Sequence, residues 1–317
     1  MKLFLSEDMP LSDKKIGYEK PVFLVGSCFS NNIGEKLDFY QFDTYLNSHG
    51  IVFNPLSLAK SLTDVLESKQ YDIKDLDTRD DIYFSYHHHG EFSSINENKV
   101  LDKINTRISS ANKVIQKSSH LIITFGTAWV YELINTGEIV ANCHKMPSKL
   151  FKKRLLSVNE IKQAFLNLTT KIKAINPGIA FVYTVSPVRH IKDGLTENAR
   201  SKAILLEAIH QIKEEINCEY FPSYEIMMDE LRDYRFYKQD LIHPNDQAVD
   251  YIWNKFQHAY LTDETKLIVK QIAKLKQQMN HRFLHPDSNQ AKEFQEQLKS
   301  KLLAFNKKYP HIKKLSV

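Results

Sequence analysis

The sequence has few cysteines and no long apolar run, and each absence excludes a class of protein. Its 317 residues include three cysteines, Cys28, Cys143 and Cys218, with no C-x-x-C pair among them. They are too few and too scattered for a disulfide framework or a zinc knuckle, so we expect reduced thiols. No stretch approaches the roughly 20 apolar residues that a membrane-spanning helix needs. A soluble protein without a membrane span is therefore expected.

The sequence also lacks the pattern of a signal peptide and any repetitive segment. The first residues, MKLFLSEDMPLSDKK, reach acidic side chains before the apolar core of a signal peptide could form, so we expect a cytoplasmic protein. There is no internal repeat and no low-complexity segment. With 42% hydrophobic and 11% aromatic residues, the chain can bury one large core, or a core plus an appendage.

The positive charge of the chain is concentrated in its last part. The formal net charge is +5, but residues 262–317 hold 12 Lys and Arg against 5 Asp and Glu, so residues 1–261 carry a net −2. A nucleic-acid surface needs basic residues interleaved with aromatic ones, and residues 1–261 lack that pattern. We therefore expect no nucleic-acid partner.

Short apolar runs alternate with longer helical stretches over the first two-thirds of the chain. The runs at 21–25, 121–125 and 179–185 are almost continuously apolar, as in strands that are buried on both faces of a sheet. Strands alternating with helices are typical of a parallel sheet covered by helices on both sides. The predicted fold class is α/β, a three-layer α/β/α sandwich with a central parallel sheet.

Helix signals fill the intervals between these runs. Ser157 and Glu160 form a predicted capping box, and Asn245, after a His-Pro pair, is a predicted N-cap. The segment ELINTGEIVANCHK, which follows the second strand, is predicted to form a hairpin around Asn-Thr-Gly. The predicted helices span residues 54–68, 96–117, 157–175, 196–216 and 245–260.

Residues 262–317 differ in kind from residues 1–261, and we predict a domain boundary between them. Apolar residues share one helical face around Ile268 and Ile272, and another around Leu298 and Leu302. This spacing predicts two basic amphipathic helices in an antiparallel arm. The arm could pack on the sheet domain or form a contact in a homo-oligomer, and the sequence leaves both alternatives open.

Residues with reactive side chains follow the predicted strands. In doubly wound sheets, ligands bind beyond the carboxyl ends of the strands. Ser27 follows the first strand, and Asp240 and His243 precede the last predicted helix of the sheet domain. A serine becomes a nucleophile when a histidine takes its proton, and that histidine needs a group that fixes its tautomer. The backbone N–H of Ser27, at the start of a helix, could help to bind an oxyanion.

Several ordered motifs resemble the GSCFA domain family, a bacterial group similar to the SGNH (GDSL-like) hydrolases. The first is V-G-S-C-F-S at residues 25–30, where Ser30 replaces the alanine of the family pattern. Further matches occur at residues 49–55, 84–93, 124–131, 141–147, 184–190, 197–205 and 240–244, and the resemblance covers roughly residues 21–256.

The resemblance implies a flavodoxin-like α/β/α fold and a hydrolase-like site. Ser27 matches the nucleophile of the first SGNH block, and Asp240 and His243 match the D-x-x-H of the last block. Gly50 matches the glycine whose N–H helps to bind the oxyanion. The third SGNH block is G-x-N-D, but Gly126 is followed by Thr127-Ala128-Trp129, so the asparagine is missing. Its replacements could be Asn54, Asn142 or His144.

The remaining polar residues near the strand ends are candidates for substrate binding. We expect this role for His89, Gly126, Asn142, His144, Arg189 and His190. Arg189 could instead pair with a structural carboxylate. The histidine triplet at 87–89 would alternate between two faces if it were a strand, so it is not expected to act as one three-ligand metal site. Trp129 and Tyr131 are expected to be core residues, and Cys28 a small packing residue rather than the nucleophile.

The leading hypothesis is an ester hydrolase or acyltransferase that acts on an O-acyl group of a carbohydrate or a small polar molecule. The scheme requires no metal and no organic cofactor. A catalytically silent protein that binds a glycan or a metabolite on the same fold is the alternative from another class, and a metal-dependent hydrolase is a third. The sequence does not distinguish a water acceptor from a hydroxyl acceptor.

Overall fold

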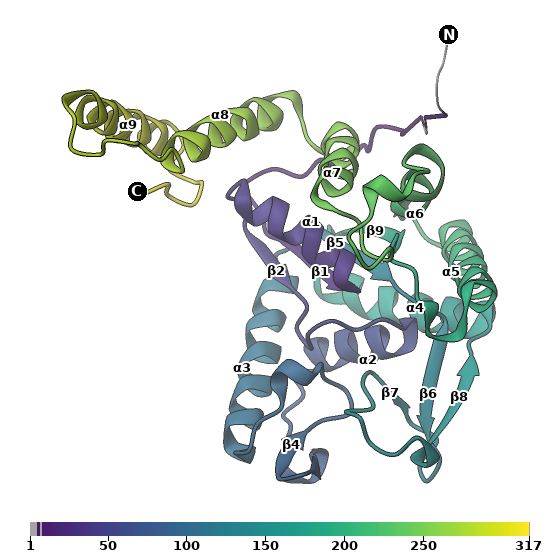
Figure 1. The fold of residues 1–317 in the computed structure, drawn as a ribbon. Helices are drawn as coiled ribbons and strands as arrows, with labels where there is room; N and C mark the ends of the chain where they lie inside the picture. The colour runs from purple at the N-terminus through teal and green to yellow at the C-terminus, as the bar shows by residue number, and fades with distance from the viewer. Residues whose placement is uncertain (1–4, 7, 317) are drawn as a thin grey trace.

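A computed structural model describes residues 5–6 and 8–316. The first residues of the segment considered above for a signal peptide lie outside this range. Five strands form a parallel sheet in the order β10-β9-β5-β1-β2 (Figure 1). Their bounds are β1 Val22–Gly26, β2 Thr44–Leu46, β5 His120–Phe125, β9 Ala180–Val185 and β10 Glu219–Tyr220. The three apolar runs of the sequence are the three central strands of this sheet, as predicted.

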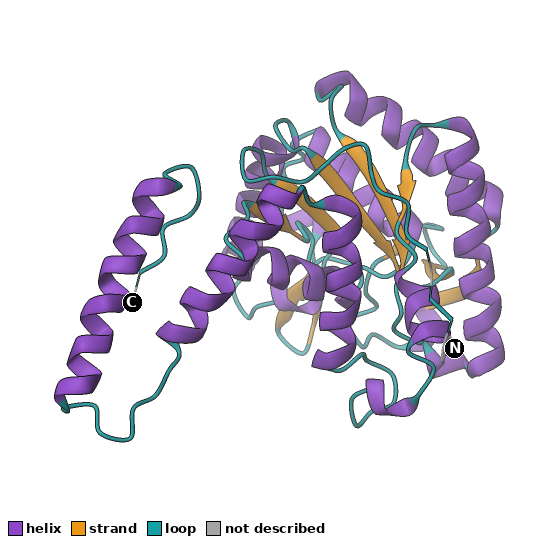
Figure 2. Ribbon diagram, turned by 90° about the horizontal axis from the view of Figure 1, so that it is seen from above, coloured by secondary structure: helices purple, strands orange, loops and turns teal. Residues whose placement is uncertain are grey.

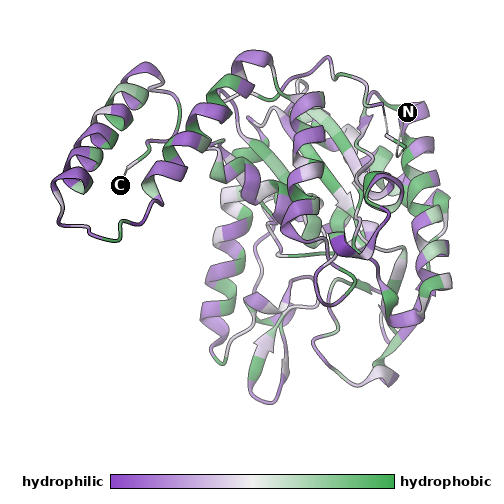
Figure 3. Ribbon diagram, turned by 45° about the horizontal axis from the view of Figure 1, so that its top comes forward, coloured by the Kyte–Doolittle hydropathy of each residue, from purple (hydrophilic) through white to green (hydrophobic). Residues whose placement is uncertain are grey.

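Helices cover both faces of the sheet, which confirms the predicted three-layer architecture. Alternate residues of β1 face opposite sides: Val22 and Leu24 pack in one apolar cluster with α1 and α7, whereas Phe23 and Val25 pack in another with α2, α4 and α5. In Figure 3 the strands of the sheet are largely hydrophobic and are enclosed by helices. The helices of this part are α1 Cys28–Phe39, α2 Pro55–Leu66, α3 Glu97–Ile115, α4 Val158–Ile175, α5 Leu195–Glu215, α6 Ser223–Glu225 and α7 Asp246–Tyr260.

The predicted helix caps are present. The side chains and backbone N–H groups of Ser157 and Glu160 hydrogen-bond to each other at the start of α4. Asn245 accepts a hydrogen bond from the Ala248 N–H at the start of α7. These bonds satisfy backbone donors that a helix cannot satisfy internally. Both helices therefore begin where the sequence places them.

The predicted hairpin is part of a second, antiparallel sheet in the order β7-β6-β8. Strand β6 spans Trp129–Leu133, β7 spans Ile139–Val140, and β8, which we had not predicted, spans Phe151–Leu155. A small two-stranded sheet joins β3 Asp77–Arg79 and β4 Ile82–Phe84. The histidine triplet follows β4 in a turn and not in a strand, so the predicted alternation of its faces is wrong.

Two helices, α8 Asp263–Met279 and α9 Asn289–Lys308, form the C-terminal part. They run antiparallel and project to one side of the α/β part (Figures 1 and 2). Their apolar residues, such as Ile272 and Leu302, belong to the same cluster as α1 and α7. Thr262 caps α8 and Ser288 caps α9. Within the described range, no helix is long and apolar enough to cross a membrane.

Candidate active site

Ser27 lies at the end of β1, at the N-cap of α1. A side chain at the preceding Gly26, whose φ is +140°, would clash with the backbone of Thr124 on β5, so this tight strand-to-helix turn requires glycine. The Ser27 side chain is 2% exposed, and its Oγ does not cap the helix. Among residues 5–6 and 8–316 this Oγ has no hydrogen-bond partner. A buried hydroxyl without a partner is unusual, and this one stands directly after a central strand, where ligands bind in doubly wound sheets.

Asp240 and His243 form a hydrogen-bonded pair in the loop before α7. The His243 Nδ1 and the Asp240 Oδ2 are 2.7 Å apart. The other carboxylate oxygen accepts the backbone N–H groups of Ile242 at 2.9 Å and His243 at 3.0 Å. The backbone hydrogen bond from His243 is the largest cause that lowers the pKa of Asp240, to about 2. The carboxylate therefore stays ionised and directs the Nε2 of His243 away from itself.

Helices α1 and α7 run parallel, so Ser27 and His243 lie at the same end of the fold. Lys36 pairs with Asp250, and the rings of Tyr40 and Trp253 stack at 5.6 Å. No hydrogen bond joins the Ser27 Oγ to His243 in the part of the chain that the structure describes.

The three backbone or amide groups considered as oxyanion donors already have acceptors inside the protein. The Ser27 N–H donates to the Thr124 carbonyl at 3.2 Å, and the Gly50 N–H donates to the Asn47 carbonyl at 2.9 Å. Asn54 caps α2, and its Nδ2 donates to the Ser57 Oγ at 3.0 Å. These groups can therefore donate to an oxyanion only if their hydrogen bonds to the internal acceptors break.

The first turn of α1 has backbone N–H groups that do not donate to another residue that the structure describes. Within the described ranges the Phe29 N–H has no acceptor, and the Cys28 N–H faces only its own sulfur. They lie at the positive end of a 12-residue helix, next to the unpartnered Ser27 Oγ. Burial raises the pKa of the Cys28 thiol, which keeps it protonated and less reactive than a typical helix-terminal thiol. Ser27 therefore suits the role of nucleophile better than Cys28 does.

A cavity of about 200 Å³ lies beside the loop that follows β2, between that loop and the antiparallel sheet. It brings together Asn54, His89, Asn142 and His190, which the sequence analysis selected, and Thr127, the residue after Gly126. Its other lining residues are Ile51, Phe53, Trp129, Tyr131, Val140, Ala141, Cys143, Lys153 and Asp193. The expectation that Trp129 and Tyr131 are core residues is wrong, because β6 presents both rings to this cavity.

Two buried polar atoms in the wall of this cavity are unsatisfied. The Nδ1 of His190 and the Oδ2 of Asp193 have no hydrogen-bond partner among the residues described. The other Asp193 oxygen pairs with Lys153, whose Nζ lies 4.7 Å from the centre of the Trp129 ring. Buried polar groups are normally paired, by protein or by something bound. An aromatic face beside free hydrogen-bonding groups suits a polar, ring-shaped ligand.

His144 and Arg189 lie outside this cavity. The Nε2 of His144 is bonded to the carbonyls of Ser85 at 2.9 Å and His88 at 3.1 Å, and its ring lines a neighbouring cleft. Arg189 donates to the Met228 Sδ at 3.4 Å and its guanidinium lies 4.9 Å from the centre of the Tyr237 ring. No carboxylate pairs with Arg189 in the described part of the chain.

Tyr237 links Arg189 to the loop that carries His243. Tyr237 forms a β-bridge with Pro244, the residue after His243. Arg189 therefore stands beside the Asp240–His243 loop with its charge unpaired, at the same end of the fold as Ser27. An unpaired guanidinium in this position could bind an anionic group of a substrate.

A polar face of α5 holds the strand ends together, and sequence reasoning missed its role. The Asn198 side chain accepts the His190 N–H at 2.8 Å, and the Ser201 Oγ accepts the Ala128 N–H at 2.7 Å. Lys202 bonds to the carbonyls of Gly126 and Ser186. These three polar residues lie at positions i, i+3 and i+4 of one helix face, and all are buried. Their spacing within 197–205 is the signal that could have revealed them.

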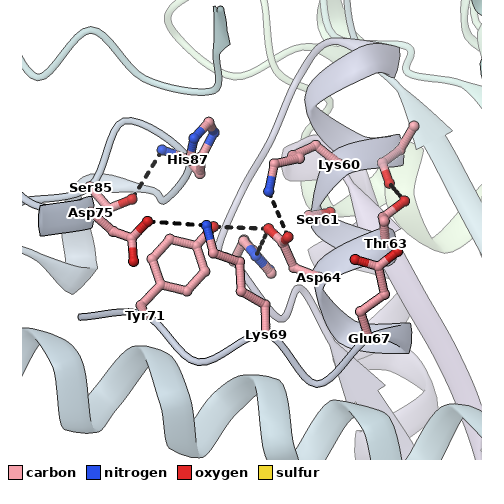
Figure 4. Close-up of polar contacts among 12 residues, drawn as sticks. Lys60, Ser61, Thr63, Asp64, Glu67, Lys69, Tyr71, Asp75, Ser85 and His87 are labelled. Carbon is pink, nitrogen blue, oxygen red and sulfur yellow. Dashed lines mark hydrogen bonds and ion pairs between the residues drawn. The ribbon is translucent and has the colours of Figure 1, made fainter.

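A second buried polar cluster centres on Asp64 of α2 (Figure 4). Its carboxylate accepts hydrogen bonds from Lys60 at 2.6 Å and the Tyr71 hydroxyl at 2.8 Å, and lies 3.4 Å from the His49 Nε2. The His49 ring stacks on His88 at 4.3 Å. The residue after His49 is Gly50, so the cluster fixes the loop that leads into the cavity. Nowhere in the described ranges do three or more His, Cys, Asp or Glu residues gather as a metal site.

Family models match both parts of the chain. The GSCFA family model matches residues 21–256, and the model of the GSCFA domain protein C-terminal domain matches residues 272–316. The chain belongs to the GSCFA family. A comparison with curated proteins found no match. The proposed residue boundary of the GSCFA protein, between 261 and 262, stays a prediction.

The GSCFA chain also has similar solved structures at low sequence identity. One is a carbohydrate esterase family 3 protein from Talaromyces cellulolyticus, at 9% identity and a TM-score of 0.37, covering 80% of this chain and 99% of that one. Another is the acetyl xylan esterase Est2A from Butyrivibrio proteoclasticus, at 10% identity and a TM-score of 0.36, covering 76% of this chain and 65% of that one.

Proposed function

We propose that the protein is a serine-dependent ester hydrolase or acyltransferase that acts on an O-acyl group of a carbohydrate-like or small polar molecule. The observation that carries the proposal is the Asp240–His243 pair, which precedes α7 at the same end of the fold as the buried Ser27 Oγ without a partner. The intact order of serine, aspartate and histidine in a GSCFA chain supports it. No metal or organic cofactor enters the scheme.

In the proposed reaction the Ser27 Oγ attacks the acyl carbonyl carbon while the His243 Nε2 takes its proton. Asp240 holds the Nδ1 proton and stabilises the imidazolium that forms. The negative oxygen of the tetrahedral intermediate faces the first-turn N–H groups of α1. Collapse releases the alcohol, which receives the proton from His243, and leaves an acyl group on Ser27. Water or a second hydroxyl then attacks the acyl-enzyme.

The reaction requires a contact between Ser27 and His243 that forms when a substrate binds. The His243 side chain is 40% exposed, so it has room to turn towards Ser27. Catalytic hydrogen bonds are often long or misaligned in unliganded sites. The alcohol part of the substrate would occupy the cavity beside Trp129, with His89, Asn142 and His190 as hydrogen-bonding groups. Arg189, beside the Asp240–His243 loop, would hold an anionic group.

Steady-state hydrolysis of a p-nitrophenyl acetate and acetylated-sugar panel tests the proposal. Ser27→Ala and His243→Ala should each lose about 10³-fold or more in kcat. Ser61→Ala, which removes another buried hydroxyl, and His258→Ala, which removes an exposed histidine of α7, are the matched controls and should retain activity. Wild-type turnover that persists in both Ser27→Ala and His243→Ala would exclude the proposal.

A catalytically silent binding protein is the second candidate. It is favoured by the internal acceptors of Ser27, Gly50 and Asn54. It predicts thermal-shift binding of a glycan or metabolite that survives Ser27→Ala and His243→Ala, with no turnover on any ester of the panel.

We also propose that the C-terminal helices contact a second copy of the chain. The exposed Leu303 of α9 and Leu267 of α8 support this idea. Light scattering after size-exclusion chromatography should show a dimer or larger species that Leu303→Glu converts to a monomer. A wild-type mass equal to one chain at all concentrations would exclude it.

A further inference from the structure

Lys202 is a lysine with no access to solvent. It lies on α5, its side chain is 1% exposed, and its Nζ donates to the carbonyl oxygens of Gly126 at 2.8 Å and Ser186 at 2.7 Å. Burying an ammonium group is costly, and proteins normally compensate with a carboxylate. No carboxylate pairs with Lys202 within residues 5–6 and 8–316. A buried cation of this kind calls for a functional explanation.

The two carbonyls that bind Lys202 are those that directly follow the central strands. Gly126 follows β5 and Ser186 follows β9. On the neighbouring strand β1, Gly26 pairs with Thr124, and the Ser27 N–H donates to the Thr124 carbonyl. Cys28 and Lys202 are also close enough to interact electrostatically. Lys202 thus sits under the strand ends next to the Ser27–Cys28 turn.

The same residues also hold the loop at 51–54, whose Val52 N–H donates to the carbonyl of Gly26, the residue before Ser27, at 3.2 Å. The N–H groups of Gly126 and Thr127 both donate to the Phe53 carbonyl, at 2.8 and 3.1 Å. The Gly126 carbonyl accepts the Lys202 ammonium group, so both the N–H and the carbonyl of Gly126 are hydrogen-bonded. Displacing the ammonium group would free the Gly126 and Ser186 carbonyls together. Lys202 consequently fixes the positions of β5, β9 and the 51–54 loop relative to Ser27.

We propose that Lys202 is a positioning residue of the candidate active site, which fixes the strand ends around Ser27 and supplies the positive charge that stabilises the oxyanion. In this role it compensates for the asparagine that is missing after Gly126. The inference rests on the proposed ester chemistry at Ser27. Lys202 does not contact the reacting atoms, and it acts through the backbone of Gly126 and through its charge.

The groups that face Lys202 determine when it is charged. They are Cys28 on α1, His190 after β9, and the Tyr224 ring on α6 at 5.6 Å. Burial lowers the pKa of Lys202 to about 7. Burial is also the largest cause that lowers the pKa of His190, and burial raises the pKa values of Cys28 and Tyr224, so these neighbours favour their neutral forms. The charge of Lys202 is therefore present at acid and neutral pH and is lost as the pH rises through about 7.

Lys202→Gln tests the proposal because glutamine keeps two N–H donors for the two carbonyls but removes the charge. Two readouts are followed from pH 6 to pH 9.5. The first is the kcat for p-nitrophenyl acetate. The second is the rate at which iodoacetamide alkylates Cys28, resolved from Cys143 and Cys218 by peptide mass mapping. Lys213→Gln, an exposed lysine of the same helix, is the matched control. If the glutamine variant does not fold, Lys202→Met, which also removes the charge, is compared with wild type by the same two readouts.

The proposal predicts a kcat about tenfold or more below wild type at pH 6.5, less than the 10²- to 10³-fold effect of a direct oxyanion donor. The alkaline fall of wild-type activity should disappear in Lys202→Gln, and Cys28 should be alkylated more slowly because its thiolate loses a neighbouring positive charge. A wild-type pH profile and an unchanged Cys28 rate in Lys202→Gln would overturn the inference. Failure of the proposed function itself would appear separately, as wild-type turnover that survives Ser27→Ala.

Discussion

The imidazole of His243 and the carboxylate of Asp240 are joined by a 2.7 Å hydrogen bond from Nδ1 to Oδ2. The same carboxylate also accepts two backbone N–H groups of its own loop, so its position is fixed by three bonds. This arrangement sets the tautomer of His243 with the Nε2 free to accept a proton. The separation of three residues between Asp240 and His243 lets one turn of the loop supply both the carboxylate and the backbone N–H groups that bind it.

Asp240→Asn should preserve the fold and lower kcat by about 10³- to 10⁴-fold, because an amide can hold His243 in the wrong tautomer. Steady-state kinetics with p-nitrophenyl acetate and a thermal melt of the same sample measure both effects. Asp246→Asn, at the start of α7, is the matched control. An Asp240→Asn enzyme with wild-type kcat would show that the pair has no role in proton transfer.

Trp129→Ala should raise KM for an acetylated sugar about tenfold, while kcat/KM for p-nitrophenyl acetate changes much less. The reason is that the Trp129 ring lines the cavity proposed for the sugar, whereas Ser27 is not among the residues that line it. Tyr234→Ala, which removes an exposed aromatic ring outside the cavity, should leave both constants unchanged. Equal losses on the two substrates would place Trp129 in a structural role.

Gly50→Ala should lower both stability and activity. Gly50 has a φ of +75°, where a side chain is strained, and a Cβ there would clash with His89 in the cavity wall. We expect a loss of about 1 kcal/mol or more in the free energy of unfolding, together with a raised KM. Urea denaturation and steady-state kinetics measure the two effects. Gly137→Ala shares a positive φ in an open turn, so it should show the stability loss without the change in KM.

The Asp64 cluster should make the protein sensitive to acid. Burial alone would raise the pKa of Asp64, but the nearby His49 ring and the hydrogen bond from Lys60 outweigh burial and hold this pKa below its usual range. The carboxylate therefore binds protons more readily in the unfolded chain. Its stabilising contribution is present above the unfolded-state value, about 3.9, and is lost as the pH falls below it towards the folded-state value.

Urea denaturation between pH 3 and pH 7 measures this contribution. Asp64→Asn should reduce stability at pH 7 and flatten its fall below about pH 4. Tyr71→Phe removes one hydrogen bond to Asp64 and should cost about 1 to 2 kcal/mol at neutral pH. Asp81→Asn, an exposed carboxylate, is the control. A wild-type pH slope in Asp64→Asn would show that other carboxylates cause the acid sensitivity.

The central sheet was predictable because burial on both faces leaves a continuous apolar run. Strands β1, β5 and β9 are of this kind, and the caps at Ser157 and Asn245 depend only on local sequence. Strand β8 was missed because FKKRL carries three consecutive basic residues and one of its faces is open to solvent. The alternation considered for the histidine triplet at 87–89 applies only to a strand, and the structure places the triplet in a turn after β4.

The site was predictable only where the chemistry is local or follows a strand directly. Ser27 and the Asp240–His243 pair meet those conditions. Lys202, Asp193 and Lys153 do not, because a lysine or aspartate in a helix, a strand or a short loop has the same sequence pattern whether it faces solvent or a cavity. The acceptors of the Ser27 and Gly50 N–H groups depend on contacts between segments far apart in the chain. The cytoplasmic location expected from the sequence also stays a prediction.

Covalent labelling of Ser27 tests the central claim most directly. The wild-type protein is treated with a fluorophosphonate, and the modified residue is located by peptide mass mapping. The account predicts one adduct, on Ser27, which is absent from Ser27→Ala and forms at least about 100-fold more slowly in His243→Ala because the proton acceptor is gone. A labelled residue other than Ser27, or labelling of Ser27 at the same rate without His243, would contradict it.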